Sequence, residues 1–327
     1  MKSDLYKRLF RAIFTEDIIS LKKIAHSIIH SERELGHNRL ADELEKIVTT
    51  ERPKHTDMFS AVAQSNMTSL PKSKRNNMQL VTYINHDQLK HHMVLPENIE
   101  DRLSLIEKEF TAQERLKRYN LTPKKKILLH GAPGCGKTLS AERIAWNLGL
   151  PLLKVRFDSL ISSYFGESAS NLRLVFDYCK KEPVVLLLDE CDFIAKSRIA
   201  TQDVGEVPRI VNMLLTLLDE YDAPGLVIAT TNLKVTLDEA LFRRFDDVIE
   251  IPMPSETEIV QLLQMTLSAV LVDSKVDLKE LAKKLQGYSA ANVVSTAQNA
   301  AKYAVLSGLK YVSSVHFEQA LTELTKF

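Results

Sequence analysis

Residues 131–138 of this sequence combine glycine, lysine and threonine at a spacing suited to phosphate chemistry. They read GAPGCGKT after the apolar run 127–129, which matches the Walker A pattern. Glycines permit a tight turn in which several backbone N–H groups point at one phosphate oxyanion. We expect Lys137 to reach the β- and γ-phosphates of a nucleotide and the Thr138 hydroxyl to ligate Mg²⁺. The predicted nucleotide-binding residues here are Gly131, Ala132, Pro133, Gly134, Cys135, Gly136, Lys137, Thr138 and Leu139.

A second chemical pattern lies at residues 184–190, which read VVLLLDE. An apolar strand that ends in two acids is typical of a Walker B motif. We expect Asp189 to hold Mg²⁺ and to contribute to nucleotide binding, and Glu190 to orient and deprotonate the attacking water. An acidic strand end at the surface is the alternative. The position of this pattern downstream of residues 131–138 favours the metal site.

Two further places carry candidate catalytic side chains. The apolar run 225–232 ends in Asn232, whose amide could hydrogen-bond the γ-phosphate or the attacking water. Arg243 and Arg244 follow the helix-like stretch LDEALF and precede the strand-like DVIEI. They could reach the γ-phosphate of a neighbouring subunit and neutralise charge in the transition state. The alternative is a solvated pair that the dipole at a helix end favours.

The elements that would position these residues alternate between strand and helix. A helix is predicted at about 97–118, and β-rich runs follow at 126–130, 152–157, 184–189, 225–230 and 247–251. Strands that alternate with helices imply a parallel sheet covered on both faces. We therefore predict an α/β fold: a P-loop core with a five-stranded parallel sheet, followed by a helical lid and preceded by a small helical domain.

The flanking segments differ from this core. Apolar residues recur at helical spacing in 1–51, whereas residues 52–95 contain prolines, polar residues and a basic cluster and read as a linker. After Pro254 the pattern is helical throughout, with a capping box at 255–258 and a cap at Asp277. The predicted domains are an N-terminal helical bundle at 1–51, a linker at 52–95, the nucleotide-binding core at 96–252 and the lid at 253–327.

Composition excludes several classes of protein. The formal net charge of +1 gives no overall attraction to nucleic acid or to an anionic membrane surface. No apolar run is long enough to span a bilayer, and the N-terminus lacks the apolar core of a secretory signal. Three cysteines without zinc-like spacing do not suggest a disulfide framework. We expect a cytoplasmic protein.

The motifs GAPGCGKT, VVLLLDE, ATTN and DEALFRRFDDVIEIPMP occur in this order, and together they resemble the AAA family of AAA+ ATPases over about residues 95–325. The resemblance implies ATP hydrolysis with Mg²⁺ in a ring, usually a homohexamer, with ATP bound between subunits. Asn232 then corresponds to the sensor-1 residue, and Arg243 and Arg244 correspond to arginine fingers. Hydrolysis should depend on assembly.

This sequence departs from the family pattern at three points. Many members carry Arg-Pro-Gly-Arg before Phe-Asp, and the shorter Arg243-Arg244 form is closer to the katanin and spastin branch. The stretch GYSAANVV resembles the family's Gly-x-Ser-Gly-Ala-Asp segment near the adenine, with Asn292 in place of Asp. Ala291 lies where other AAA+ branches have a sensor-2 arginine and is a candidate nucleotide-binding residue.

Residues 158–176 resemble the family's first pore loop and the helix after it, with Tyr164, Phe165 and Gly166 at the aromatic-apolar-glycine positions. In the family these residues grip an extended polypeptide, although Tyr164 and Phe165 could instead pack in a core. The leading hypothesis is an ATP-driven remodeller or unfoldase of a partner protein. The alternatives are an ATP-gated regulator of a companion protease or toxin, which would not thread its partner, and a DNA-directed AAA+ machine.

Overall fold

The computed structural model describes residues 24–25, 27–30, 33, 41–42, 44–45, 70–73, 77–161, 167–192, 206–232 and 239–324. The chain divides into two compact units, residues 59–253 and residues 1–58 with 254–327. The described residues within 1–50 are helical, and Arg33 pairs there with Asp42 and Glu45. The predicted pore-loop residues Tyr164, Phe165 and Gly166 lie outside the described residues.

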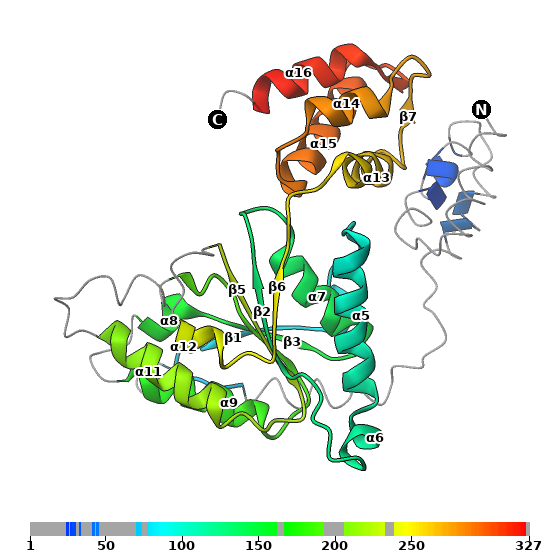
Figure 1. Ribbon diagram of the computed structural model, residues 1–327. Helices are drawn as coiled ribbons and strands as arrows, with labels where there is room; N and C mark the ends of the chain where they lie inside the picture. The colour runs from blue at the N-terminus through cyan, green and yellow to red at the C-terminus, as the bar shows by residue number, and fades with distance from the viewer. Residues whose placement is uncertain are drawn as a thin grey trace. The chain divides into compact units, whose positions relative to one another are not determined.

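Strands of the first unit form a sheet between two groups of helices (Figure 1). Among the described residues the sheet has six strands, in the order β1-β3-β4-β5-β2-β6. Their bounds are β1 Val81–Ile84, β2 Lys126–His130, β3 Leu152–Val155, β4 Val185–Leu188, β5 Leu226–Thr231 and β6 Asp247–Glu250.

The predicted α/β fold is confirmed, but the predicted number of strands is wrong. All five expected strands form and pair in parallel, and β1 adds a sixth strand that runs antiparallel to β3. This strand lies inside the stretch expected to be a linker. A strand of four residues, VTYI, is too short to show a period of two in the sequence. Pairing with β3 and burial of Val81 stabilise it in the structure.

Successive residues of the strands point to opposite faces and enter two separate cores. Leu128 packs with α9 and α11 on one face, whereas Ile127 and Leu129 pack with α5 and α7 on the other. Figure 1 shows these two helical layers with the sheet between them. The helices of this unit are α5 Glu97–Thr111, α6 Gln113–Lys117, α7 Lys137–Asn147, α8 Phe157–Ile161, α9 Ser168–Cys179, α11 Glu206–Asp219 and α12 Glu239–Phe242, with the 3-10 turn η2 at His86–Gln88.

Residues after Pro254 form a helical bundle with capped helix starts. Glu258 accepts a hydrogen bond from the Ser255 amide at 2.7 Å, and Asp277 accepts one from the Lys279 amide at 2.8 Å, as the sequence predicted. A short parallel pair of strands, which the sequence analysis did not predict, joins the bundle. The elements are α13 Glu256–Thr266, β7 Leu271–Val272, α14 Leu278–Lys284, α15 Ala290–Leu306, β8 Tyr311–Val312 and α16 Ser314–Leu324. Within the described ranges, no helix has the length and apolarity needed to cross a bilayer.

Candidate functional site

The loop between β2 and α7 requires glycine at several positions. Gly131 has a φ of 145°, and a Cβ placed there would lie 2.2 Å from the carbonyl oxygen of Ile251. Gly134 and Gly136 have φ values of 76° and 102°, in a region that L side chains rarely adopt. The helix α7 begins directly after Gly136. The loop therefore presents the N-terminus of α7, where an anion is stabilised by backbone N–H groups.

The other predicted loop residues differ in exposure. Pro133 is exposed, Ala132 and Leu139 are half-buried, and Cys135 is buried with its Sγ 3.5 Å from the Sδ of Met253. Ala132 packs against the core on the α7 face of the sheet. Cys135 is thus held by packing from the segment that follows β6.

Lys137 is a buried lysine whose ammonium group binds the loop itself. Its Nζ donates to the carbonyl oxygens of Gly131 and Ala132 at 2.9 and 2.8 Å, and the residue is 7% exposed. Burial lowers the pKa of Lys137, while the nearby Cys135 and acidic groups oppose this shift. The ammonium therefore rests on neutral carbonyls at the place where the sequence predicts a phosphate.

Asp189 follows β4 at the carboxyl edge of the sheet, where both of its oxygens accept hydrogen bonds. Thr138 and Thr230 donate to Oδ1 at 2.8 and 2.6 Å, and the Lys154 ammonium donates to Oδ2 at 2.5 Å. Burial raises the pKa of Asp189, but these donors outweigh burial and the pKa lies below its ordinary value. Asp189 is therefore stabilised as a carboxylate beside the hydroxyl of Thr138.

Glu190 adopts a left-handed backbone conformation, with a φ of 55°. Such a conformation costs a non-glycine residue about 1 kcal/mol or more and is found preferentially at functional sites. The Glu190 amide donates to the Thr230 hydroxyl at 2.9 Å, which holds the backbone in place. Glu190 is exposed, so its side chain is accessible to water.

Asn232 directly follows β5, which ends at Thr231, and it is held by Asp192. The Asn232 side-chain amide donates to Asp192 Oδ2 at 3.0 Å, and its backbone amide donates to Oδ1 at 2.9 Å. Thr231 donates to the same Oδ1 at 2.7 Å. Burial raises the pKa of Asp192, but these hydrogen bonds outweigh it and lower the pKa. Strand β5 lies between β4 and β2 and runs parallel to both. Asn232 therefore lies at the same carboxyl edge of the sheet as Asp189 and the loop 131–136.

The two predicted arginine fingers lie just before β6 and have different surroundings. Arg243 is exposed, whereas Arg244 is half-buried and its Nε donates to Asp219 Oδ2 at 2.9 Å. Of the two arginines, Arg243 is thus the more exposed to solvent.

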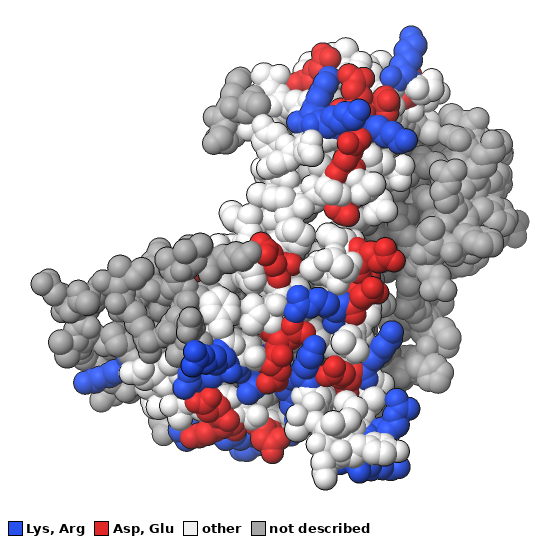
Figure 2. Space-filling view, viewed as in Figure 1, with Lys and Arg blue, Asp and Glu red and all other residues white. Residues whose placement is uncertain are grey.

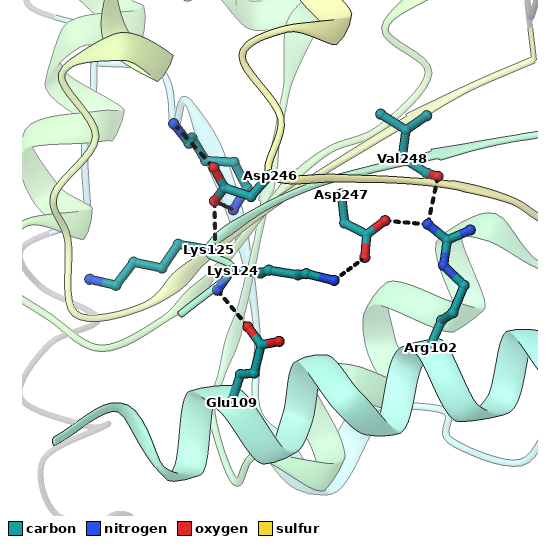
Figure 3. Close-up of polar contacts among 8 residues, drawn as sticks. Arg102, Glu109, Lys124, Lys125, Asp246, Asp247 and Val248 are labelled. Atoms are coloured by element: carbon teal, nitrogen blue, oxygen red, sulfur yellow. Dashed lines mark hydrogen bonds and ion pairs between the residues drawn. The ribbon is translucent and has the colours of Figure 1, made fainter. Parts of the chain in front are cut away.

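The segment after the arginines is fixed by two aspartates (Figure 3). Asp246 accepts hydrogen bonds from the backbone amides of Lys125 and Lys126 at 2.8 and 2.9 Å. Asp247 binds the Lys124 ammonium at 2.8 Å and also pairs with Arg102 of α5. Figure 3 shows these side chains converging on the start of β6 from α5 and from the residues leading into β2.

Ala291 lies in the unit that contains residues 254–327 and is exposed at the start of α15. The Ser289 side chain caps this helix by accepting a hydrogen bond from the Asn292 amide at 3.3 Å. Four polar residues of the site were not among the predicted residues: Lys154, Thr230, Thr231 and Asp192. Thr230 and Asp192 were visible in the ATTN and DECD stretches, beside predicted residues. Lys154 lies 35 residues before its partner Asp189, and no local pattern marks it.

Comparison with known proteins identifies the family. The profile of the ATPase family associated with various cellular activities (AAA) matches residues 127–253. An uncharacterized AAA family ATPase of Sinorhizobium fredii is 32% identical over 323 residues, which cover 98% of this chain and 95% of that protein. This chain belongs to the AAA family of ATPases. The AAA ATPase fold accounts for the order of the motifs along the sheet edge, and ATP hydrolysis is the activity of this family.

Two other relatives of this AAA ATPase have names that link them to the proteasome. The proteasome-activating nucleotidase of Methanosphaerula palustris is 32% identical over 238 residues, and a 26S proteasome regulatory subunit homolog of Arabidopsis thaliana is 33% identical over 239 residues. Each match covers 71% of this chain and 58% or 60% of the relative. The AAA ATPase thus aligns with only part of these longer proteins.

Proposed function

We propose that this AAA ATPase is a Mg²⁺-dependent ATP hydrolase that assembles into a homohexameric ring and remodels or unfolds a partner protein. The observation that carries the hydrolytic part is the convergence of Lys137, Thr138, Asp189, Glu190 and Asn232 on the carboxyl edge of one sheet. In open α/β sheets this edge is where ligands bind.

The metal site is supported by its donors. A threonine hydroxyl and a carboxylate lie within hydrogen-bonding distance, at 2.8 Å between Thr138 and Asp189, and such hard oxygen donors suit Mg²⁺. Thr138 and Asp189 would hold the ion. Bound Mg²⁺ would neutralise charge on the β- and γ-phosphates.

Each catalytic side chain has a role that follows from its position. Lys137 would exchange the carbonyls of Gly131 and Ala132 for phosphate oxygens, because a charged acceptor binds an ammonium more strongly than a neutral one. Glu190, whose side chain is exposed, would accept the proton of the attacking water. Asn232, oriented by Asp192, would hold that water or the γ-phosphate in line.

Assembly would complete the site. Arg243 is exposed, and we assign it the principal finger role toward the γ-phosphate of the neighbouring subunit. Arg244, bonded to Asp219, would support its position. The absence of Pro-Gly between the arginines favours the katanin and spastin branch. Replacing Arg243 with alanine is expected to lower kcat on the scale of roughly 1,000-fold, and Arg244→Ala is expected to lower it less.

A protein substrate is supported by two observations. Two relatives carry names that link them to the proteasome, and residues 164–166 match the aromatic pattern of a pore loop.

On the face of the 59–253 unit seen in Figure 2, basic and acidic side chains are intermixed, whereas a DNA-directed machine would benefit from a continuous basic surface. We also propose a cytoplasmic location, because no disulfide bond joins Cys135, Cys179 or Cys191 in the described part of the chain.

The test combines two variants. With Tyr164→Ala, ATP turnover should remain and unfolding of a captured partner should stop. The partner is first trapped on the Glu190→Gln protein and identified by mass spectrometry. Unchanged unfolding by Tyr164→Ala would refute threading. Full control of the partner by Glu190→Gln would favour the alternative, an ATP-gated regulator of a companion protease or toxin.

A further inference from the structure

Lys154 places a cation directly on the carboxylate that is proposed to hold the metal. Lys154 lies on β3 and pairs in register with Leu187 of the neighbouring strand β4. Leu187 is two residues before Asp189 in the chain. The Nζ of Lys154 is 2.5 Å from Asp189 Oδ2. The side chain of Lys154 is 41% exposed, whereas that of Asp189 is 9% exposed. The aspartate is thus buried and the lysine reaches it from the surface.

The two carboxylate oxygens of Asp189 have different kinds of hydrogen-bond donor. Oδ1 accepts the hydroxyls of Thr138 and Thr230, and Oδ2 accepts the Lys154 ammonium. A buried carboxylate without a compensating charge is strongly unfavourable. Lys137 does not supply this charge directly, because its ammonium binds the carbonyls of Gly131 and Ala132. Lys154 is therefore the counter-ion that compensates the charge of Asp189 in this arrangement.

Of the three hydrogen bonds to Asp189, the one from Lys154 can be broken most easily. A lysine is a point charge on a flexible stem and remains well hydrated when it moves into solvent. The other two donors are the hydroxyls of Thr138 and Thr230. The Thr230 hydroxyl also accepts a hydrogen bond from the Glu190 amide. A divalent cation that approaches Asp189 would compete with the ammonium for the same carboxylate.

We propose that Lys154 is an exchangeable counter-ion for Asp189: it neutralises the carboxylate before the metal binds and leaves it when Mg²⁺ arrives with the nucleotide. Lys154 is a positioning residue in this role. It orients the Asp189 carboxylate through Oδ2, and it raises the metal concentration needed to load the site. This inference rests on the proposed magnesium site of the AAA ATPase.

The experiment compares Lys154→Met with Arg156→Met. Arg156 is a matched control: it lies two residues further on, is 39% exposed and pairs with the exposed Asp158, so its replacement removes the same charge. Each protein is saturated with a non-hydrolysable ATP analogue and titrated with Mg²⁺. The readout is the Mg²⁺ concentration that gives half of the rise in unfolding temperature. Titration with Mn²⁺ by electron paramagnetic resonance provides a second readout. The nucleotide binds metal equally in all samples, so differences report on the protein.

Lys154→Met should need about fivefold to tenfold less metal than the wild type, because the competing ammonium and its repulsion of the metal are both removed. Lys154→Arg, which keeps the charge, and Arg156→Met should stay near the wild type. An unchanged or higher metal requirement in Lys154→Met would overturn the inference. If the wild type itself shows no metal-dependent rise, the magnesium site is wrong instead. Unfolding curves without nucleotide establish that each variant is folded.

Discussion

Two buried aspartates lie at opposite edges of the sheet, one at the carboxyl ends of the strands and one at the amino ends. They are similar in burial and in their lysine partner, but they differ in their other partners. Asp189 follows β4 at the carboxyl edge, and Asp247 begins β6 at the amino edge. Their side chains are 9% and 8% exposed, and each pairs with one partly exposed lysine, Lys154 or Lys124. Residue type and burial therefore do not distinguish the site from the scaffold.

The remaining partners make the difference. Asp189 otherwise accepts the hydroxyls of Thr138 and Thr230, which can turn and offer lone pairs to a metal or its waters. Asp247 otherwise binds the guanidinium of Arg102, which is always charged and only donates. We therefore propose that the first aspartate exchanges partners during the reaction, whereas the second holds α5 against β6. Four predictions test this comparison.

The largest expected effect concerns activity. Asp189→Asn should lower kcat by about 100-fold, the scale of losing one electrostatic contact to the transition state. Asp247→Asn should change kcat by no more than a few-fold in protein that remains folded. Steady-state ATP hydrolysis at saturating Mg²⁺ measures both variants. A large loss of kcat in folded Asp247→Asn protein would show that the amino edge also contributes to catalysis.

Stability should show the opposite order. Asp247→Asn leaves the charges of Lys124 and Arg102 without their partner, and the free energy of unfolding should fall by about 2 kcal/mol, reduced from the fully buried case because both cations are partly exposed. Asp189→Asn should cost less than about 1 kcal/mol, because Lys154 can move into solvent and the amide oxygen can still accept a hydroxyl. Denaturant unfolding without nucleotide tests this order, and equal losses would contradict it.

The pH dependence of stability should follow Asp247. Burial raises the pKa of Asp247, but the bonds from Lys124 and Arg102 outweigh it and the pKa is lowered. A depressed pKa in the folded state stabilises the fold above the unfolded value of about 3.9, and this contribution is lost as pH falls through the folded value.

The wild type should therefore exceed Asp247→Asn in stability by a constant amount between about pH 5 and 8, and the gap should narrow below about pH 4. A gap that persists unchanged at pH 3 would mean that the charge of Asp247 is not what stabilises the wild type.

The smallest effect serves as the reference for the others. Lys117 pairs with Glu114 at 2.9 Å, but both side chains are well exposed. Lys117→Met should change the free energy of unfolding by less than about 0.5 kcal/mol and leave ATP hydrolysis unchanged. A loss comparable to that of Asp247→Asn would show that exposure does not separate the two kinds of ion pair in this protein.

Much of the architecture was predictable because the signals are local. Spacing within residues 131–138 required a glycine loop before a helix, and the structure has three positive-φ glycines there and α7 beginning at Lys137. Apolar runs such as 184–188 predicted buried strands, and the caps at Ser255 and Asp277 depend on neighbours within a few residues. Strand β1 was missed because its four residues become a strand only through pairing with β3.

The sequence by itself determined the family, the order of the strands along the chain and the residue types available at the sheet edge, since motifs and periodicity reside in short segments. Only the tertiary structure decided which charges meet. Lys154 lies 35 residues from Asp189, and Arg102 lies 145 residues from Asp247. These pairs form because the sheet sets distant segments side by side. The partners it supplies make one aspartate exchangeable and the other fixed.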